Sequence, residues 1–240
     1  MVLVRYTIGI LLVSLILFFG LLPRQLPRAS SAGLLRAQQA GEEKNKDKRT
    51  YTNDDWPFNR PRSTSEPAPQ KGVEVVKGAE GGKVAPFVPT PMPVVEKMLE
   101  MAQVTPTDVI YDLGSGDGRI VIHAAQRYGA KGVGVELDRN LAQESADQVR
   151  ELKLGDQVTI IQGDLFQANI KPATVVTVYL LPGANDKLRP MLERDLKPGS
   201  RVVAHDIRIP GWRWARTEAV EVGGGTHFIY LYQIPDAFGK

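Results

Sequence analysis

The sequence predicts an α/β fold built on a mostly parallel β-sheet that ends in an antiparallel C-terminal hairpin. An apolar strand at 109–111 leads into a glycine-rich turn and a helix-compatible segment, which is the first βα unit of such a sheet. A run of β-branched and aromatic residues at 174–181 is typical of a central parallel strand. Near the C-terminus, strands at 218–222 and 228–234 flank three glycines, which predicts the hairpin.

The glycine-rich turn carries the most informative chemistry of the chain. It reads Asp112-Leu-Gly-Ser-Gly-Asp-Gly, and its glycines let the backbone turn sharply and approach a ligand closely. A dinucleotide fingerprint instead reads G-x-G-x-x-G and delivers a pyrophosphate to the helix N-terminus. Asp112 would repel a pyrophosphate, but it suits a ligand that carries an ammonium group and a sulfonium. S-adenosylmethionine (SAM) is such a ligand.

A second acid follows the next predicted strand. Residues 132–136, GVGVE, form a short buried strand, and Glu136 lies about 20 residues after the glycine turn, where an acid can accept hydrogen bonds from ribose hydroxyls. The other expected elements are a helix over 94–102, a helix over 138–152 capped by Asp138, strands at 158–162 and 201–205, and a helix that ends at Leu196.

Together these residues resemble the class I SAM-dependent methyltransferases. The sequence DLGSGDGR at 112–119 is similar to motif I of that family, and GVGVELD at 132–138 to the acidic strand end that follows it. The resemblance implies a Rossmann-like sheet of seven strands and SAM as the cofactor. The predicted cofactor-binding residues are Thr90, Asp112, Gly114, Ser115, Gly116, Glu136, Asp164 and Leu165.

Three of these residues are implied by the resemblance alone. The stretch from Val88 into motif I is similar to a bacterial methyltransferase group in which a P-T-P loop lies over the cofactor site. Thr90 is therefore either a cofactor contact or part of a rigid connector. In the family, an acid after the third strand receives the adenine amino group and the next residue packs on the ring; Asp164 and Leu165 match these positions.

The acceptor side of the predicted enzyme is less defined. Methyl transfer from a sulfonium needs a base only if the acceptor is protonated, as a lysine ammonium is. Tyr179, His205 and Asp206 lie at predicted strand ends and are the candidates, although His205 is equally interpretable as a hydrogen-bonded structural histidine. Residues 85–206 also resemble, more distantly, the mitochondrial lysine methyltransferases that modify the ATP synthase c-subunit. This implies a protein lysine as acceptor, with a small molecule as the second choice.

Composition excludes several other functions. The 240 residues carry a formal net charge of only +3 with no Lys/Arg cluster on one face, so no nucleic-acid partner is expected. No cysteine is present, and the three histidines lack a metal-ligand spacing, so no metal centre is expected. The alternative functions are a nicotinamide-dependent oxidoreductase and a non-catalytic, membrane-tethered SAM-binding module.

The N-terminal region precedes the predicted methyltransferase domain at 85–240. Residues 1–32 form a signal peptide or a membrane anchor, because Arg5 and Arg24 bracket the uncharged, apolar run 6–23. Residues 33–84 are predicted to be a disordered linker. The anchor is preferred, with the domain on the cytoplasmic side where SAM is found; export after cleavage at Ala32 is the alternative.

Overall fold

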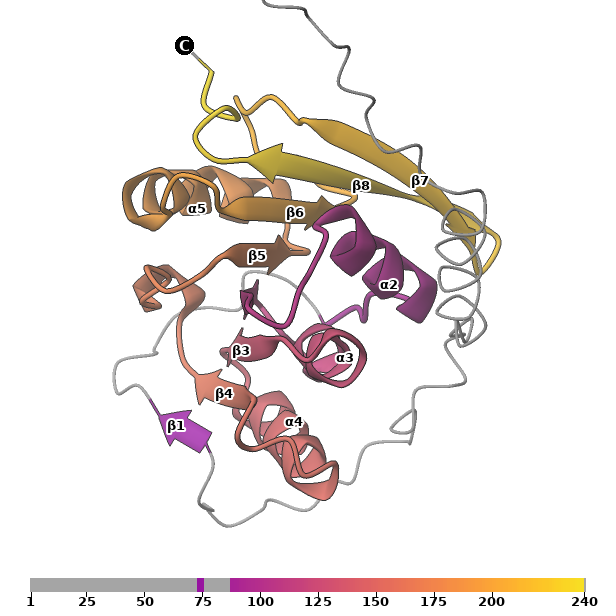
Figure 1. Cartoon of the computed structure of the whole chain (residues 1–240), viewed down its shortest axis with the longest axis vertical. Helices are drawn as coiled ribbons and strands as arrows, with labels where there is room; N and C mark the ends of the chain where they lie inside the picture. The colour runs from indigo at the N-terminus through magenta and orange to yellow at the C-terminus, as the bar shows by residue number, and fades with distance from the viewer. Residues whose placement is uncertain (1–72, 76–86, 240) are drawn as a thin grey trace, which may run out of the picture. The chain divides into compact units, whose positions relative to one another are not determined.

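A computed structural model of the chain describes residues 73–75 and 87–239. Within them, eight strands form one sheet in the order β1-β4-β3-β2-β5-β6-β8-β7 (Figure 1). The strands are β1 (Val73–Val75), β2 (Val109–Leu113), β3 (Lys131–Glu136), β4 (Val158–Gln162), β5 (Val175–Val178), β6 (Arg201–His205), β7 (Arg216–Val222) and β8 (Gly225–Gln233).

This topology confirms the predicted fold class. The strands from β1 to β6 pair in parallel, whereas β8 runs antiparallel to both β6 and β7. The seven predicted strands correspond to β2–β8. Strand β1 adds an eighth at the edge, where Val73 pairs with Ile160 of β4. It belongs to the range 33–84 that was predicted as a linker, and the remainder of that range lies outside the described residues.

Among the described residues, four α-helices cover the two faces of the sheet. Helices α2 (Met92–Met101), α3 (Arg119–Tyr128) and α4 (Arg139–Glu151) lie on one face, and α5 (Pro182–Asp195) lies on the other (Figure 1). The prediction that Asp138 caps the second of the crossover helices is confirmed, because its carboxylate accepts hydrogen bonds from the backbone N–H groups of Asn140 and Leu141. A short 3-10 helix, η2 (Leu165–Gln167), follows β4.

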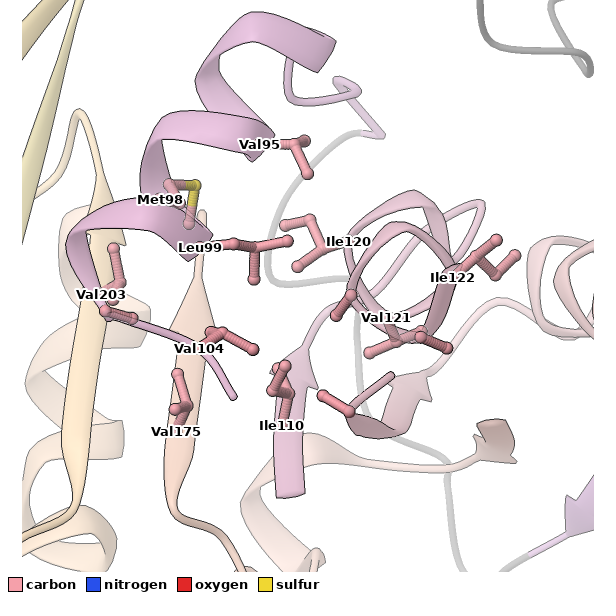
Figure 2. Packing of buried hydrophobic residues seen from close by; sticks show 14 of the residues in the cluster. Val95, Met98, Leu99, Val104, Ile110, Ile120, Val121, Ile122, Val175 and Val203 are labelled. Carbon is pink, nitrogen blue, oxygen red and sulfur yellow. The ribbon is translucent and has the colours of Figure 1, made fainter. Parts of the chain in front are cut away.

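Each face of the sheet buries its own hydrophobic cluster. On the first face, Leu99 of α2 and Ile120 of α3 lie side by side over the strands, near Ile110 and Val175 (Figure 2). On the second face, the apolar side of α5 packs against strand residues that include Leu113, Val176 and Tyr232. The central strands are therefore buried on both faces, which explains why their sequences are almost continuously apolar.

The predicted membrane anchor and its localisation are corrected by the structure. Within 73–75 and 87–239, no helix is long and apolar enough to cross a membrane. The apolar run at 6–23 and the cleavage site at Ala32 lie outside the described residues, and neither an anchored nor an exported form has support.

The contact between β3 and α3 gives a stability prediction. A Cβ atom at Gly132 would lie 2.7 Å from Val121 Cβ and 3.1 Å from Val121 O, so the helix and the strand would have to separate. Gly132→Ala should therefore lower the free energy of unfolding by about 1–3 kcal/mol, the usual range for overpacking. Gly155→Ala is the matched control, because its Cβ would meet no heavy atom within 4 Å. Urea denaturation measures both, and equal midpoints would contradict the predicted steric conflict.

Candidate active site

The C-terminal ends of the parallel strands surround one cavity of about 310 Å³. This is the edge of an open α/β sheet at which ligands bind. All eight residues predicted to bind cofactor lie along its wall, contributed by the segment before α2 and by the ends of β2, β3 and β4. They are Thr90, Asp112, Gly114, Ser115, Gly116, Glu136, Asp164 and Leu165.

The glycine turn adopts a backbone that other residues rarely adopt. Gly114, Gly116 and Gly118 have φ angles of 87°, 55° and 74°, all in the left-handed region. A Cβ atom at Gly116 would lie only 2.4 Å from the Phe87 ring, which lies across the turn. The Phe87 ring therefore occupies the place that a side chain at position 116 would take.

Glu136 holds this turn against the end of β3. Its Oε2 accepts a hydrogen bond of 2.8 Å from the Gly116 N–H, and its Oε1 accepts one of 2.8 Å from the Asp138 N–H. Each carboxylate oxygen has further acceptor capacity, so Glu136 can bind ligand hydroxyls while it orients the turn. Sequence spacing predicted the position of Glu136 but not this link to Gly116.

Asp112 is a buried carboxyl group in the floor of the cavity. Only 3% of its surface is exposed, and burial raises its pKa to about 7. A hydrogen bond of 2.7 Å from the Thr177 hydroxyl opposes this rise, whereas the negative charges of Asp117 and Glu136 add to it. A cationic group in the cavity would favour the ionised form.

The segment before α2 is fastened over the cavity from two sides. The buried guanidinium of Arg119 donates a hydrogen bond of 3.0 Å to the Thr90 carbonyl and pairs with Asp117 at 2.6 Å. On the other side, Thr90 Oγ1 shares a hydrogen bond of 3.1 Å with His205 Nδ1. Thr90 therefore joins the glycine turn to the end of β6.

The three candidate catalytic residues occupy different positions. Tyr179 lines the cavity, whereas His205 and Asp206 are not part of the lining that the described residues form. His205 lies directly behind it, with its ring centroid 3.9 Å from that of Tyr179. Burial lowers the pKa of His205 to about 4 against the opposing effect of Asp206, so its ring is neutral. Their assignment as catalytic residues stays a prediction.

Several residues of the wall were not predicted as site residues, and five of them have an aromatic or charged side chain with no role assigned from the sequence. Arg119 was visible as the last residue of DLGSGDGR, and Asp117 also lies inside that motif, but neither side chain had an assigned role. Phe87, Phe166 and Lys187 gave no local signal, because only the fold brings them to the cavity. The missed residues are Phe87, Asp117, Arg119, Phe166 and Lys187.

The cavity fits SAM by two tests on the chain itself. The backbone of Gly114 and Gly116 lines the cavity without a Cβ atom, and buried Ser115 Oγ has no hydrogen-bond partner among the described residues. The acids Asp112, Glu136 and Asp164 stand at three successive strand ends around it. This sheet topology together with this acid-bearing glycine turn defines the class: a SAM-dependent methyltransferase with a Rossmann-like sheet.

Comparison with known proteins refines that class. Residues 112–216 match the family model for the ANTKMT methyltransferase domain. A protein-lysine N-methyltransferase of Saccharolobus islandicus is 44% identical over 150 residues, which cover 62% of this chain and 93% of that protein. A lysine N-methyltransferase of the ATP synthase c-subunit, from Xenopus laevis, is 28% identical over 169 residues, which cover 62% of this chain and 74% of that protein.

Among solved structures, an RNA methyltransferase from Salinibacter ruber in complex with S-adenosyl-L-homocysteine is 51% identical, with a TM-score of 0.58. The match covers 62% of this chain and 95% of that one. The chain belongs to the family of SAM-dependent methyltransferases, and SAM is its cofactor. The oxidoreductase and non-catalytic alternatives receive no support from these relatives.

The raised pKa of Asp112 gives a pH prediction for the ligand-free protein. The carboxyl has a pKa near 3.8 when unfolded and about 7 when folded, so stability is lost as pH rises between these values. Asp112→Asn removes this loss. The variant should gain stability over the wild type by up to about 1.4 kcal/mol per pH unit between pH 5 and 7, and no more above that.

Urea denaturation across pH 5–8 measures this difference. Asp156→Asn, at an exposed turn position, is the control and should show a constant difference from the wild type. A stability difference for Asp112→Asn that does not change with pH would contradict the raised pKa.

Proposed function

We propose that this methyltransferase transfers the methyl group to a lysine side chain of a protein. The observation that carries the proposal is the charge of the cavity wall. Among the described residues, five acidic side chains line it against two cationic ones, and one of those cations, Arg119, is already paired with Asp117. The acidic residues are Asp112, Asp117, Glu136, Asp138 and Asp164. A negative cavity attracts an ammonium group and repels a phosphate chain.

The charge of the wall and the names of two relatives support the same acceptor class. The relatives from Saccharolobus islandicus and Xenopus laevis are both lysine N-methyltransferases. An RNA acceptor is the second candidate, because the relative from Salinibacter ruber is described as an RNA methyltransferase. Proteins that bind RNA neutralise phosphates with basic patches, and the acidic wall argues against that acceptor.

In this proposal the chain contributes positioning. Bound SAM supplies an electrophilic methyl group on a sulfonium, so no covalent nucleophile from the protein is needed. Glu136 accepts hydrogen bonds from the ribose, Asp164 receives the adenine amino group, and Leu165 packs on the ring. Asp112 offers its carboxylate to the cationic part of the ligand. The segment around Thr90, which is fastened over the cavity, excludes water from the reaction.

On the acceptor side, Tyr179 is the polar side chain that we assign to the lysine. It comes from the residue after β5, it lines the cavity, and it is packed against His205. A lysine ammonium must lose one proton, to a base or to water, before its nitrogen can attack, so a neutral amine held near the Tyr179 hydroxyl is the reactive form. His205 stands behind this wall and positions Tyr179 and Thr90 without touching the acceptor.

The role of Glu136 predicts a loss of SAM affinity on substitution. Glu136→Ala removes the acceptor for ribose hydroxyls and the anchor of the Gly116 N–H. Hydrogen bonds to a charged group contribute about 1.5–3 kcal/mol, so the Kd for SAM should rise at least about tenfold. Calorimetric titration measures it, with Glu151→Ala at the exposed end of α4 as the control. An unchanged Kd for Glu136→Ala would refute the ribose role.

The acceptor class is tested by label transfer. The protein is incubated with methyl-labelled SAM and a lysate of its source cells, and the products are split between RNase and protease treatment. We expect protease-sensitive label that acid hydrolysis yields as methyl-lysine, and none with Gly116→Val, whose side chain would meet Phe87. Label that RNase removes would overturn the lysine proposal and favour the RNA acceptor, while leaving the methyltransferase class intact.

A further inference from the structure

A compact cluster of metal-ligating side chains stands beside the cavity. His205 ends β6, Asp206 follows it, and His227 lies on β8. Antiparallel pairing between β6 and β8 brings them together, although His227 is 22 residues away from His205 along the chain. Asp206 has a φ of 54°, a left-handed conformation that Asp adopts more readily than most residues.

Three atoms of this cluster form a nearly equilateral triangle. His205 Nε2 lies 2.9 Å from His227 Nδ1, and His227 Nδ1 lies 2.9 Å from Asp206 Oδ2. The third side, from His205 Nε2 to Asp206 Oδ2, is 3.2 Å. Each atom is therefore in polar contact with both of the others.

Hydrogen bonds alone satisfy this triangle poorly. If the His227 Nδ1–H donates to Asp206, it cannot also point well at His205 Nε2, which is then an acceptor without a well-aligned donor. If His205 Nε2–H donates instead to His227, the bare Nδ1 of His227 faces the carboxylate lone pairs. If both nitrogens are protonated, both N–H groups can donate to Asp206 Oδ2, but the two nitrogens then lie 2.9 Å apart with no hydrogen bond between them. A single cation shared by three lone pairs resolves the conflict.

The spacing also suits such a cation. Ligand atoms that bind one Zn²⁺ at about 2.0–2.1 Å in a tetrahedron lie about 3.3 Å from one another. The three distances, 2.9, 2.9 and 3.2 Å, come within a few tenths of an ångström of that value before any adjustment to an ion. Two imidazoles with one carboxylate are ligands typical of zinc and neighbouring transition metals rather than of Mg²⁺.

The surroundings of the cluster provide the outer contacts that metal ligands usually have. His205 Nδ1 shares a hydrogen bond with Thr90 Oγ1 at 3.1 Å, and Asp206 Oδ1 accepts one of 2.7 Å from the Phe228 N–H. The side chain of His205 is fully buried, whereas those of Asp206 and His227 are 25% and 23% exposed. An ion can therefore enter from the solvent side and keep a water ligand there.

We propose that His205, Asp206 and His227 bind one divalent transition-metal ion of the Zn²⁺ type. With His205 Nε2 on the ion, its Nδ1 carries the proton and donates to Thr90 Oγ1, which fixes the wall of the cavity on that side. The ion is thus a clamp between β6, β8 and the segment before α2. This proposal is independent of the methyl acceptor and departs from the sequence-based expectation of no metal centre.

Metal content tests the proposal directly. The full-length chain without an affinity tag is stripped with a chelator, dialysed against Zn²⁺ or Co²⁺, and assayed by elemental analysis and visible absorption. We expect about one ion per chain and the visible bands of low-symmetry, four-coordinate Co²⁺. An excess of Mg²⁺ should not displace either ion. A wild-type chain that retains no ion after dialysis would overturn the site.

Two variants and one control locate the ion. His227→Gln and Asp206→Asn should each reduce the bound metal at least about tenfold, and Asn tolerates the left-handed backbone at position 206. Asp156→Asn, at an exposed turn, should retain the full ion content. Circular dichroism confirms that each variant is folded. Metal content that is equal in folded variants and wild type would place the ion elsewhere and refute this assignment.

Discussion

The hydrogen bond from the Gly116 N–H to the Glu136 carboxylate is the interaction on which the site depends. It connects the left-handed glycine turn after β2 to the end of β3, so the ends of these two neighbouring strands are held in a fixed arrangement. Position 116 cannot carry a side chain, because a Cβ atom there would meet Phe87. Glycine at position 116 is therefore needed for the contact with Phe87, and Glu136 holds the backbone of the turn in place.

Charge gives this space its chemical character. Asp112 at the floor is buried enough to hold its proton near neutral pH, and the neighbouring acids Asp117 and Glu136 contribute to that. Such a carboxyl is costly to ionise unless a cation comes near it. The burial that makes ionised Asp112 unfavourable in the ligand-free site thus makes the site selective for cationic ligands. SAM and a lysine side chain both carry positive charge.

Thr90 links the cavity to the histidine cluster behind it. Its carbonyl accepts a hydrogen bond from Arg119 of the glycine motif, and its hydroxyl shares one with His205 at the end of β6. A change at His205, Asp206 or His227 can therefore reach the wall of the cofactor cavity through the hydrogen bonds of Thr90. This makes the second half of the sheet relevant to cofactor binding, although motif I and Glu136 belong to the first half.

Sequence alone determined the fold class, the glycine turn and Glu136, because each depends on local patterns: apolar strands, left-handed glycines and the length of one βα unit. The N-cap role of Asp138 and the C-terminal hairpin were also predictable from neighbouring residues. Tertiary structure decided the rest. Strand β1 has only three residues and gives no periodic signal, and Phe87, Phe166 and Lys187 reach the cavity only through the packing of separate elements. The histidines at 205 and 227 show no metal spacing along the chain, because antiparallel pairing, not sequence distance, brings their nitrogens within 2.9 Å.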